Sequence, residues 1–204
     1  MSFLDKRDVL SNIKNLKTII LDLGCGPGKK KPTWIGIDVI DYDCVDIVGD
    51  IYEVLNKFPD ETVDEIHAYH FFEHLSDFPR ILSILQRIIK PHGEIVIVVP
   101  HFSNPYYFSD YTHKAFFGLY SLSYLSKDDI FKRKVPNYNV ELGLKLKTVK
   151  LYFKSPFLFK LPFKKFYQFV FNLSNGTKEF YEESLCYTFP CYEIEYILGK
   201  NFNK

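Results

Sequence analysis

Short β-type runs alternate with helical patterns in the first half of the chain, and this alternation limits the fold more than any other feature. We expect five strands, at Thr18–Leu23, Thr33–Asp38, Val45–Val48, Val63–Tyr69 and Gly93–Val99. Runs of this length that alternate with helices are typical of a parallel sheet covered on its faces. The pattern therefore predicts an α/β fold.

Helical spacing is clearest before the fifth strand. Six apolar residues recur there at three- and four-residue intervals and predict one buried helix face: Phe78, Ile81, Leu82, Leu85, Ile88 and Ile89. Lys90–Gly93 contains a proline and a glycine, so we expect it to end that helix and start the next strand. An amphipathic helix is expected to precede the first strand, over roughly Phe3–Asn15.

The chain changes character after Pro100 and becomes rich in aromatic residues. We expect a short helix near Ser121–Leu125, a half-exposed strand at Gly143–Phe153, a helix near Phe163–Leu173 and a closing strand at Tyr192–Leu198. Neither a repeat nor a linker interrupts the 204 residues, so we expect a single domain over residues 1–204.

Composition excludes several classes of protein. A net charge of +1 is too small for a broad nucleic-acid surface. The four cysteines, Cys25, Cys44, Cys186 and Cys191, lack the spacing of a zinc site or disulfide framework. We expect reduced thiols in a cytoplasmic protein, because we find neither a secretory signal nor an apolar run of membrane-spanning length.

Three glycines, Gly24, Gly26 and Gly28, directly follow the first expected strand in the stretch LDLGCGPG. Parallel sheets bind ligands outside the carboxyl ends of their strands. Glycine permits positive φ there and lets backbone N–H groups approach a ligand without a Cβ atom in the way. The glycines therefore predict a ligand site.

The connection to the second strand has only about ten residues and contains Pro32, so a full helix cannot fit. Without that helix, a pyrophosphate site at a helix N-terminus is weakened. The glycines also follow G-x-G-x-G rather than G-x-G-x-x-G. Both features disfavour a nicotinamide oxidoreductase.

Two acids complete the expected site. Asp38 ends the second strand, where its carboxylate can accept hydrogen bonds from both ribose hydroxyls. Asp50 follows the third strand and is placed to meet an adenine amino group. Together with the glycines, these acids predict a nucleoside-binding site.

These residues, with the segments AYHFFEHL and PHGEIVIVVP, resemble the successive motifs of class I S-adenosylmethionine-dependent methyltransferases, type 11-like, over roughly Lys17–Phe117. The resemblance implies a Rossmann-like, doubly wound, mostly parallel sheet of seven strands, in the order 3-2-1-4-5-7-6 with strand seven antiparallel. It implies S-adenosylmethionine as the cofactor. The missing helix indicates a compact subgroup with a more open pocket.

The resemblance also implies which residues line the cofactor pocket. They are Asp22, Gly24, Cys25, Gly26, Gly28, Asp38, Val39, Asp50, Ile51, Tyr69 and His70. Residues 101–190 would then contain the loop and lid elements on the side of the methyl acceptor.

Methyl transfer to a hydroxyl needs an aligned acceptor and a base for its proton. We expect His113 or His101 to be that base, with Asp110 as the orienting group. The segment DYTHKAFF, within His101–Phe117, resembles one found in bacterial methyltransferases associated with surface polysaccharides. We therefore expect O-methylation of a small molecule or saccharide. The alternative is a noncatalytic partner that binds S-adenosylmethionine or S-adenosylhomocysteine and regulates another enzyme.

Two further segments have patterns that suit a metal site and a membrane contact. His70, Glu73 and His74 have helical metal-ligand spacing, but the resemblance assigns this place to structure or to the cofactor pocket, so no metal is expected. The segment Phe153–Phe171 mixes phenylalanines with lysines and suits a peripheral membrane contact. The alternative is a lid whose lysines face water.

Overall fold

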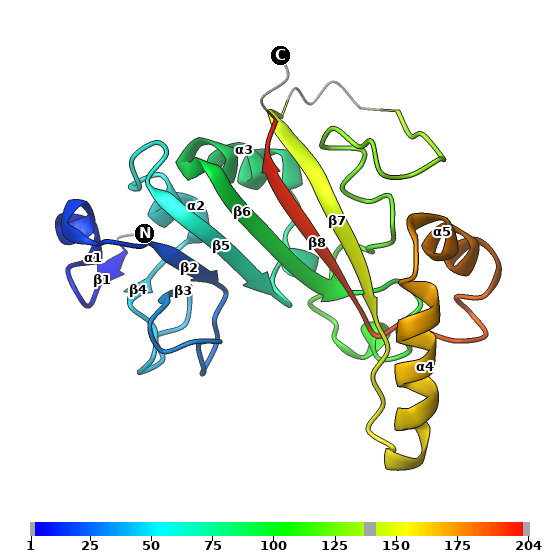
Figure 1. Cartoon of the computed structure of the whole chain (residues 1–204). Helices are drawn as coiled ribbons and strands as arrows, with labels where there is room; N and C mark the ends of the chain where they lie inside the picture. Colours follow the sequence, from blue (N-terminus) through cyan, green and yellow to red (C-terminus); the bar gives the residue numbers. More distant parts are fainter. Residues whose placement is uncertain (1–2, 137–141, 202–204) are drawn as a thin grey trace.

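The computed structural model describes residues 3–136 and 142–201. One eight-stranded sheet runs through them, with strands contributed from both halves of the chain (Figure 1). The strands are β1 (Leu4–Asp5), β2 (Ile20–Leu23), β3 (Ile35–Asp38), β4 (Ile47–Val48), β5 (Val63–Tyr69), β6 (Ile89–Pro100), β7 (Leu144–Tyr152) and β8 (Glu193–Lys200). The α-helices are α1 (Val9–Asn12), α2 (Ile51–Leu55), α3 (Phe78–Ile88), α4 (Leu161–Phe171) and α5 (Asn175–Ser184). Short 3₁₀ helices are η1 (Ile13–Asn15), η2 (Phe72–His74), η3 (Tyr107–Ser109) and η4 (Leu158–Lys160).

The strand order is β1-β4-β3-β2-β5-β6-β8-β7. If β2 is counted as strand one, the seven strands from β2 to β8 follow the expected order 3-2-1-4-5-7-6. Strand β8 is antiparallel to both β6 and β7, whereas β2 pairs in parallel with β3 and β5. The expected fold class is thus confirmed, with an eighth strand that the sequence did not indicate.

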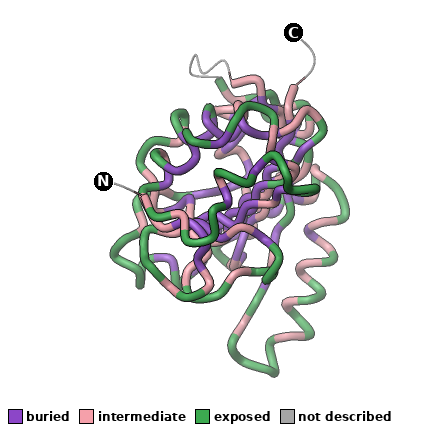
Figure 2. Tube along the Cα trace, turned by 90° about the vertical axis from the view of Figure 1, so that its left-hand side faces the viewer, coloured by how far each residue is buried: buried purple, intermediate pink, exposed green. Residues whose placement is uncertain are grey.

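One face of the sheet forms the core. Ile95, Ile97 and Val99 of β6 lie opposite Leu198, Tyr196 and Ile194 of β8, and all six are completely buried. Helices α2 and α3 pack behind this face in Figure 1, and the buried residues run through the centre of the molecule in Figure 2. The opposite face of β5, β6, β8 and β7 has no described helix in front of it (Figure 1). Residues of these strands on that face, such as Val96 and Ile197, are only partly buried.

The connection from β2 to β3, residues 24–34, consists of turns without a helix, as expected. Side chains of the connection itself cover the sheet there. The Trp34 ring stacks on His67 of β5 with ring centroids 4.1 Å apart. The Lys29 side chain is only 6% exposed and forms an ion pair of 2.8 Å with the buried carboxylate of Asp46. A stacked aromatic pair and a paired charge thus stabilise this short connection in place of a helix.

The expected helix over Phe3–Asn15 is confirmed only in its second half, as α1 and η1. Leu4 and Asp5 instead form the antiparallel edge strand β1 against β4. The Asp5 carboxylate then accepts hydrogen bonds from the N–H groups of Val9 and Leu10, which starts the one-turn helix α1. The left-handed backbone of Asp8, with φ of 52°, separates the two elements.

Two other expectations near helix ends need correction. Ser121–Leu125 forms turns rather than a helix. Ile89 and Lys90–Gly93 belong to the start of β6, because Ile89 already pairs with Val63 across a bulge.

The expected strands at Gly143–Phe153 and Tyr192–Leu198 are confirmed as β7 and β8, and the expected helix near Phe163–Leu173 is confirmed as α4.

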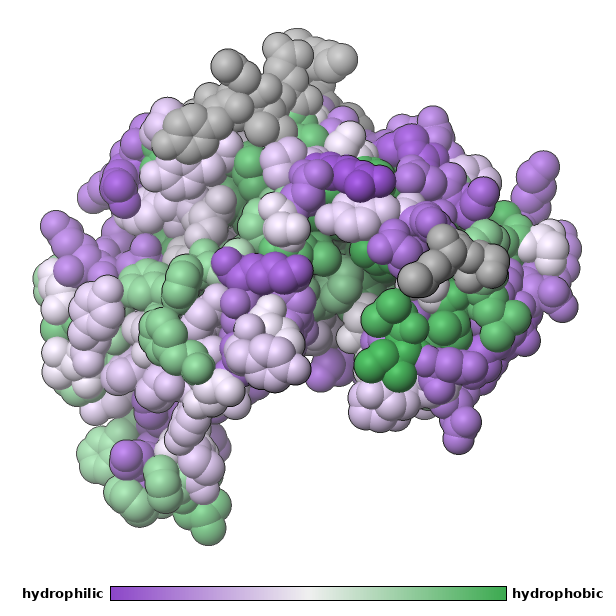
Figure 3. Space-filling model, turned by 180° about the vertical axis from the view of Figure 1, so that it is seen from behind, coloured by the Kyte–Doolittle hydropathy of each residue, from purple (hydrophilic) through white to green (hydrophobic). Residues whose placement is uncertain are grey.

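Helix α4 and the turn before it project from the rest of the molecule (Figures 1 and 3). Phe171, at the end of α4, is buried and contacts the rings of Tyr181 and Phe153. Tyr167 and Val170, in the second half of α4, also pack against the core. The start of the helix lies farther from the buried residues in Figure 2. The projection is therefore anchored mainly at the C-terminal end of its helix.

Candidate functional site

The glycine-rich loop begins where β2 ends. Gly24 and Gly26 both have positive φ, at 63° and 59°, which other residues rarely adopt. A Cβ atom on Gly24 would lie 2.5 Å from Cδ2 of Phe71, so the close approach of this ring also requires glycine. Nothing lies within 4 Å of the corresponding position on Gly26. The loop therefore has both the backbone conformation and the free space that a ligand site needs.

Asp38 lies at the carboxyl end of β3 and faces this loop. Its Oδ2 accepts a hydrogen bond of 2.8 Å from the N–H of Gly26, and its Oδ1 accepts one of 2.9 Å from the N–H of Ile40. A carboxylate has about four lone-pair positions. Asp38 is partly exposed and can accept further hydrogen bonds from a ligand. The adjacent Val39 is strongly exposed at the same edge.

Asp22 lies in β2 just before the loop, and Cys25 lies within it. The buried Asp22 carboxylate accepts a hydrogen bond of 2.8 Å from the N–H of Lys30, which holds the loop against β2. Burial raises the pKa of Asp22, although the hydrogen bond from Lys30 acts in the opposite direction. Burial, helped by the negative charges of Asp22 and Asp38, raises the pKa of the Cys25 thiol to about 12. Cys25 is therefore a neutral thiol near physiological pH.

Asp50 occupies the N-cap of α2. Its Oδ1 accepts hydrogen bonds from the N–H groups of Tyr52 and Glu53. The side chain is exposed, and the next residue, Ile51, is buried. Capping occupies one carboxylate oxygen and leaves Oδ2 for another partner.

Tyr69 ends β5, and His70 follows it directly. The ammonium of Lys30 lies over the Tyr69 ring, 4.7 Å from its centroid. The hydrogen bond to Glu193 and the nearby carboxylate of Glu73 raise the pKa of His70 to about 9, against the effect of burial. Nε2 of His70 lies 3.0 Å from Oε1 of Glu193 in β8. His70 is thus a cation at the edge of the site.

His101 is completely buried at the end of β6. Its Nδ1 lies 2.8 Å from the Ser103 hydroxyl, and its Nε2 lies 3.2 Å from Oε2 of Glu182. Both ring nitrogens therefore have protein partners. This arrangement joins β6 to α5 and does not suit a base that must reach a substrate.

His113 lies in the loop after η3, close to the other expected residue, Asp110. Its Nδ1 lies 2.9 Å from the carbonyl oxygen of Tyr107, and its Nε2 lies 3.6 Å from Oδ2 of Asp110. Hydrogen bonds from Thr112 lower the pKa of Asp110. The structure thus brings His113 and Asp110 together.

His113 also lies near two residues that our sequence analysis had grouped with His70. One ring nitrogen of His74, one of His113 and one carboxylate oxygen of Glu73 all lie within 4.8 Å of one another. Sequence spacing could not reveal this cluster, because His113 is far from the other two in the chain. Glu193, the partner of His70, was missed for the same reason.

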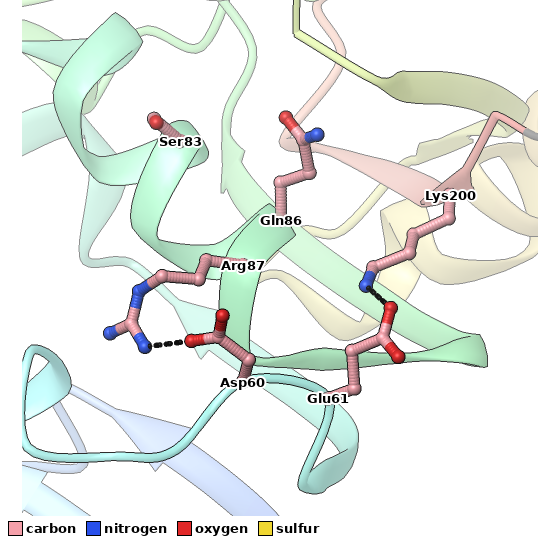
Figure 4. Close-up of a pocket in the computed structure, with 6 residues that line it drawn as sticks. All are labelled: Asp60, Glu61, Ser83, Gln86, Arg87 and Lys200. Atoms are coloured by element: carbon pink, nitrogen blue, oxygen red, sulfur yellow. Dashed lines mark hydrogen bonds and ion pairs between the residues drawn. The ribbon is translucent and has the colours of Figure 1, made fainter. Parts of the chain in front are cut away.

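Two hollows in the surface differ in how close they lie to these residues. Figure 4 shows one of about 510 Å³ next to α3, where Arg87 pairs with Asp60 and Lys200 with Glu61. It lies near the amino end of β5, at the opposite edge of the sheet from the glycine loop. Ligands of such sheets bind at the carboxyl ends, so this hollow is a poor candidate.

The second hollow, of about 150 Å³, lies beside the loop that follows β6. Tyr106, Tyr192 and three lysines, Lys154, Lys160 and Lys164, contribute to its lining. Aromatic faces and cations suit a sugar that carries a phosphate or another anionic group.

The sequence model of one protein family, described as a methyltransferase domain, matches residues 2–130. No curated protein gives a significant match. The fold resembles that of an S-adenosylmethionine-dependent methyltransferase from Archaeoglobus fulgidus, with a TM-score of 0.59 and 20% identity over 96% of this chain and 92% of that chain.

Two other solved structures are similar. A putative methyltransferase from Bacillus halodurans has a TM-score of 0.52 and 16% identity, over 93% of this chain and 96% of that one. Phosphoethanolamine N-methyltransferase 2 from Haemonchus contortus, in complex with S-adenosyl-L-methionine, has a TM-score of 0.50 and 15% identity, over 95% of this chain and 51% of that one. At such identities these likenesses concern the fold.

Proposed function

The chain belongs to the methyltransferase-domain family, and we propose that it transfers a methyl group from S-adenosylmethionine to a hydroxyl group of a small molecule or saccharide. The observation that carries the proposal is the glycine loop opposite Asp38, with positive φ at Gly24 and Gly26 and open space over Gly26. Similar folds belong to methyltransferases that use this cofactor.

In this proposal the cofactor lies across the carboxyl ends of β2, β3 and β4. Asp38 accepts hydrogen bonds from the ribose hydroxyls with its remaining lone pairs. Asp50 uses Oδ2 for the adenine amino group, and Ile51 lies beside the base. Gly24, Gly26 and the residues around them leave room for the methionine part.

The sulfonium of the cofactor already activates the methyl group, so the protein mainly aligns the acceptor and accepts its proton. His113 suits the role of base better than His101. Its Nδ1 faces a carbonyl oxygen, which can only accept a hydrogen bond, so Nδ1 carries the proton of the neutral ring and Nε2 has the lone pair. His101 is buried, and both of its nitrogens have partners.

Product formation tests this activity. Wild-type protein with S-adenosylmethionine should methylate a member of a panel of saccharides, nucleotide sugars and lipid-linked sugars, detected by mass spectrometry. His113→Ala should lower kcat while leaving the affinity for S-adenosylhomocysteine unchanged, and the exposed His92→Ala should match wild type. Cofactor binding without turnover on any acceptor would instead support the noncatalytic alternative.

The α4 projection also supports a contact with an anionic membrane surface. Seven large apolar side chains on it and around it are between 50% and 80% exposed: Phe157, Leu158, Phe159, Phe163, Phe166, Phe169 and Leu173. Figure 3 shows apolar and polar surface mixed on the projection at the lower left. Exposed apolar groups at this density mark an interaction surface.

Charge favours a bilayer over most protein partners. No acidic residue occurs between Glu141 and Glu179, whereas lysines recur throughout that stretch. Phenylalanines that enter the interface while lysines meet anionic headgroups are typical of peripheral membrane helices. No helix in residues 3–136 or 142–201 is long and apolar enough to cross a bilayer. We therefore propose surface contact, with an acceptor presented at the membrane.

Vesicle sedimentation tests the membrane contact. The protein should bind vesicles that contain phosphatidylglycerol more strongly than pure phosphatidylcholine vesicles, and salt should weaken this binding. Phe163→Ser combined with Phe166→Ser should abolish it. The control is Phe180→Ser on α5, because Phe180 is similarly exposed but lies outside the projection. Unchanged vesicle binding by the double variant would overturn the contact and leave a protein partner as the occupant.

The four cysteines are free thiols. This supports a reducing compartment, and we propose the cytoplasm.

A further inference from the structure

The cluster of Glu73, His74 and His113 is built by two segments that the backbone holds together. Glu73 and His74 lie on η2, and the carbonyl oxygen of Glu73 accepts hydrogen bonds from the N–H groups of Lys114, at 2.7 Å, and Ala115. This pairing places His113 beside η2. One potential ligand atom from each of the three residues lies within 4.8 Å of the other two.

Hydrogen bonds assign the same tautomer to both histidines. Nδ1 of His113 donates to the Tyr107 carbonyl oxygen at 2.9 Å. The Thr112 hydroxyl donates its single proton to the Asp110 carboxylate at 2.6 Å, so it must accept from Nδ1 of His74 at 2.9 Å. In its neutral form each ring therefore has its lone pair on Nε2. Metal-ligating histidines usually have this second hydrogen bond to an oxygen, which fixes the ring.

Glu73 supplies a buried negative charge to the cluster. The residue is 0% exposed, and neither carboxylate oxygen accepts a hydrogen bond from a described residue. The nearest cation is His70, whose Nδ1 lies 3.3 Å from Oε1 of Glu73 in an ion pair. Oδ2 of Asp110 lies 3.6 Å from Nε2 of His113. The carboxylates of Glu73 and Asp110 thus lie close to the two histidine rings, and the cluster contains more hydrogen-bond acceptors than donors.

We propose that Glu73, His74 and His113 bind a divalent transition-metal cation such as Zn²⁺. Two imidazoles and one carboxylate, with a further coordination position open, form a common catalytic ligand set. In a tetrahedral zinc site the ligand atoms are about 3.3 Å apart, given bonds of about 2.0–2.1 Å. The ligand atoms, which lie within 4.8 Å of one another, would therefore need to approach by at most about 1.5 Å.

The cation would change the role of His113 in the proposed methyl transfer. This consequence rests on the proposed function. With metal bound, His113 is a ligand, and the cation lowers the pKa of a hydroxyl that occupies the open position. Asp110 then lies nearby to accept the proton. Metal binding itself does not depend on methyl transfer and can be measured without an acceptor.

Metal binding is tested on untagged protein of residues 1–204 that has been treated with a chelator and then dialysed. Titration calorimetry with Zn²⁺, and elemental analysis after gel filtration, should give one equivalent per chain. Glu73→Gln, His74→Ala and His113→Ala should each lower the affinity at least tenfold, and His92→Ala should not. Thr112→Val should also weaken binding about tenfold, because it removes the hydroxyl that orients His74.

Binding of S-adenosylhomocysteine distinguishes a failure of the proposed metal site from a failure of the proposed function. Each variant should keep wild-type affinity for S-adenosylhomocysteine, which also shows that it is folded. Wild-type protein that binds no Zn²⁺, or variants that bind it as tightly as wild type, would overturn the metal site even if the cofactor still binds. Loss of cofactor binding by wild type, with Zn²⁺ binding intact, would overturn only the proposed function.

Discussion

The carboxylate of Asp38 and the N–H of Gly26 are joined by a hydrogen bond of 2.8 Å across the connection between β2 and β3. This bond fixes the distance between the glycine loop and the end of β3. The same carboxylate is the group that we expect to bind ribose. Asp38 would therefore both shape the cofactor site and contact the cofactor.

Asp38→Ala should weaken binding of S-adenosylhomocysteine by about 2–3 kcal/mol, because hydrogen bonds to a charged acceptor are lost. Calorimetry should show this as a roughly 30- to 150-fold higher Kd. Asp43→Ala, which removes an exposed acid from the following turn, is the matched control and should leave the Kd unchanged. Equal affinity of Asp38→Ala and wild type would remove Asp38 from the site.

Alanine substitutions at the three loop glycines should differ in their effect on stability. Gly28→Ala should be nearly neutral, because its φ is not positive and nothing lies within 4 Å of the added Cβ atom. Gly26→Ala should cost about 1–2 kcal/mol through its left-handed backbone. Gly24→Ala should cost more, since its Cβ would also collide with Phe71. Urea unfolding measures the order, and a Gly28→Ala variant as unstable as Gly24→Ala would contradict it.

Cys25 should resist alkylation in the folded protein. Burial and the neighbouring Asp22 and Asp38 raise the pKa of its thiol to about 12, so at pH 8 only about one molecule in 10⁴ has the reactive thiolate. Iodoacetamide treatment followed by peptide mass spectrometry should find Cys25 unmodified until urea unfolds the chain. Rapid modification of Cys25 without denaturant would show that the loop is open to solvent in solution.

The ionised carboxylate of Asp64 should stabilise the folded state, and its protonation at low pH should remove this contribution. Burial alone would raise the pKa of Asp64, but hydrogen bonds from Lys90, at 2.6 Å, and from the N–H of Ile19, at 2.8 Å, hold it below the ordinary value of 3.8. A lowered pKa means that this contribution is fully present above pH 3.8 and is lost as the pH falls through the folded-state pKa. In the Asp64→Asn variant the free energy of unfolding should therefore fall less steeply below pH 3.8 than in wild type. Urea unfolding at a series of pH values compares the two, and identical slopes would contradict the prediction.

Much of the fold could be predicted because hydrophobic spacing is local. The apolar face of α3 and the alternation in β7 are both legible in consecutive residues, and both are confirmed. The predictions were wrong where the structure of a segment depends on pairing with a strand that is distant in the sequence. Leu4 and Asp5 form β1 only because β4 offers its edge, and Ile89 leaves the helix because it pairs with Val63.

In the candidate site, too, contacts within one stretch of sequence could be predicted and contacts between distant segments could not. The glycines and Asp38 lie in one continuous stretch, so their proximity could be expected from the end of a strand. The association of His113 with Glu73 depends on backbone hydrogen bonds between η2 and a loop about forty residues later. No spacing rule within the sequence could have given that contact. No metal was expected because the resemblance assigned His70, Glu73 and His74 to structure or to the cofactor pocket.

Titration calorimetry of wild-type protein with S-adenosylhomocysteine tests the central claim most directly. The account predicts saturable binding of one ligand per chain at micromolar concentration, and no comparable binding of NADH. The absence of any binding of S-adenosylhomocysteine at high micromolar concentration, by protein shown to be folded, would contradict it.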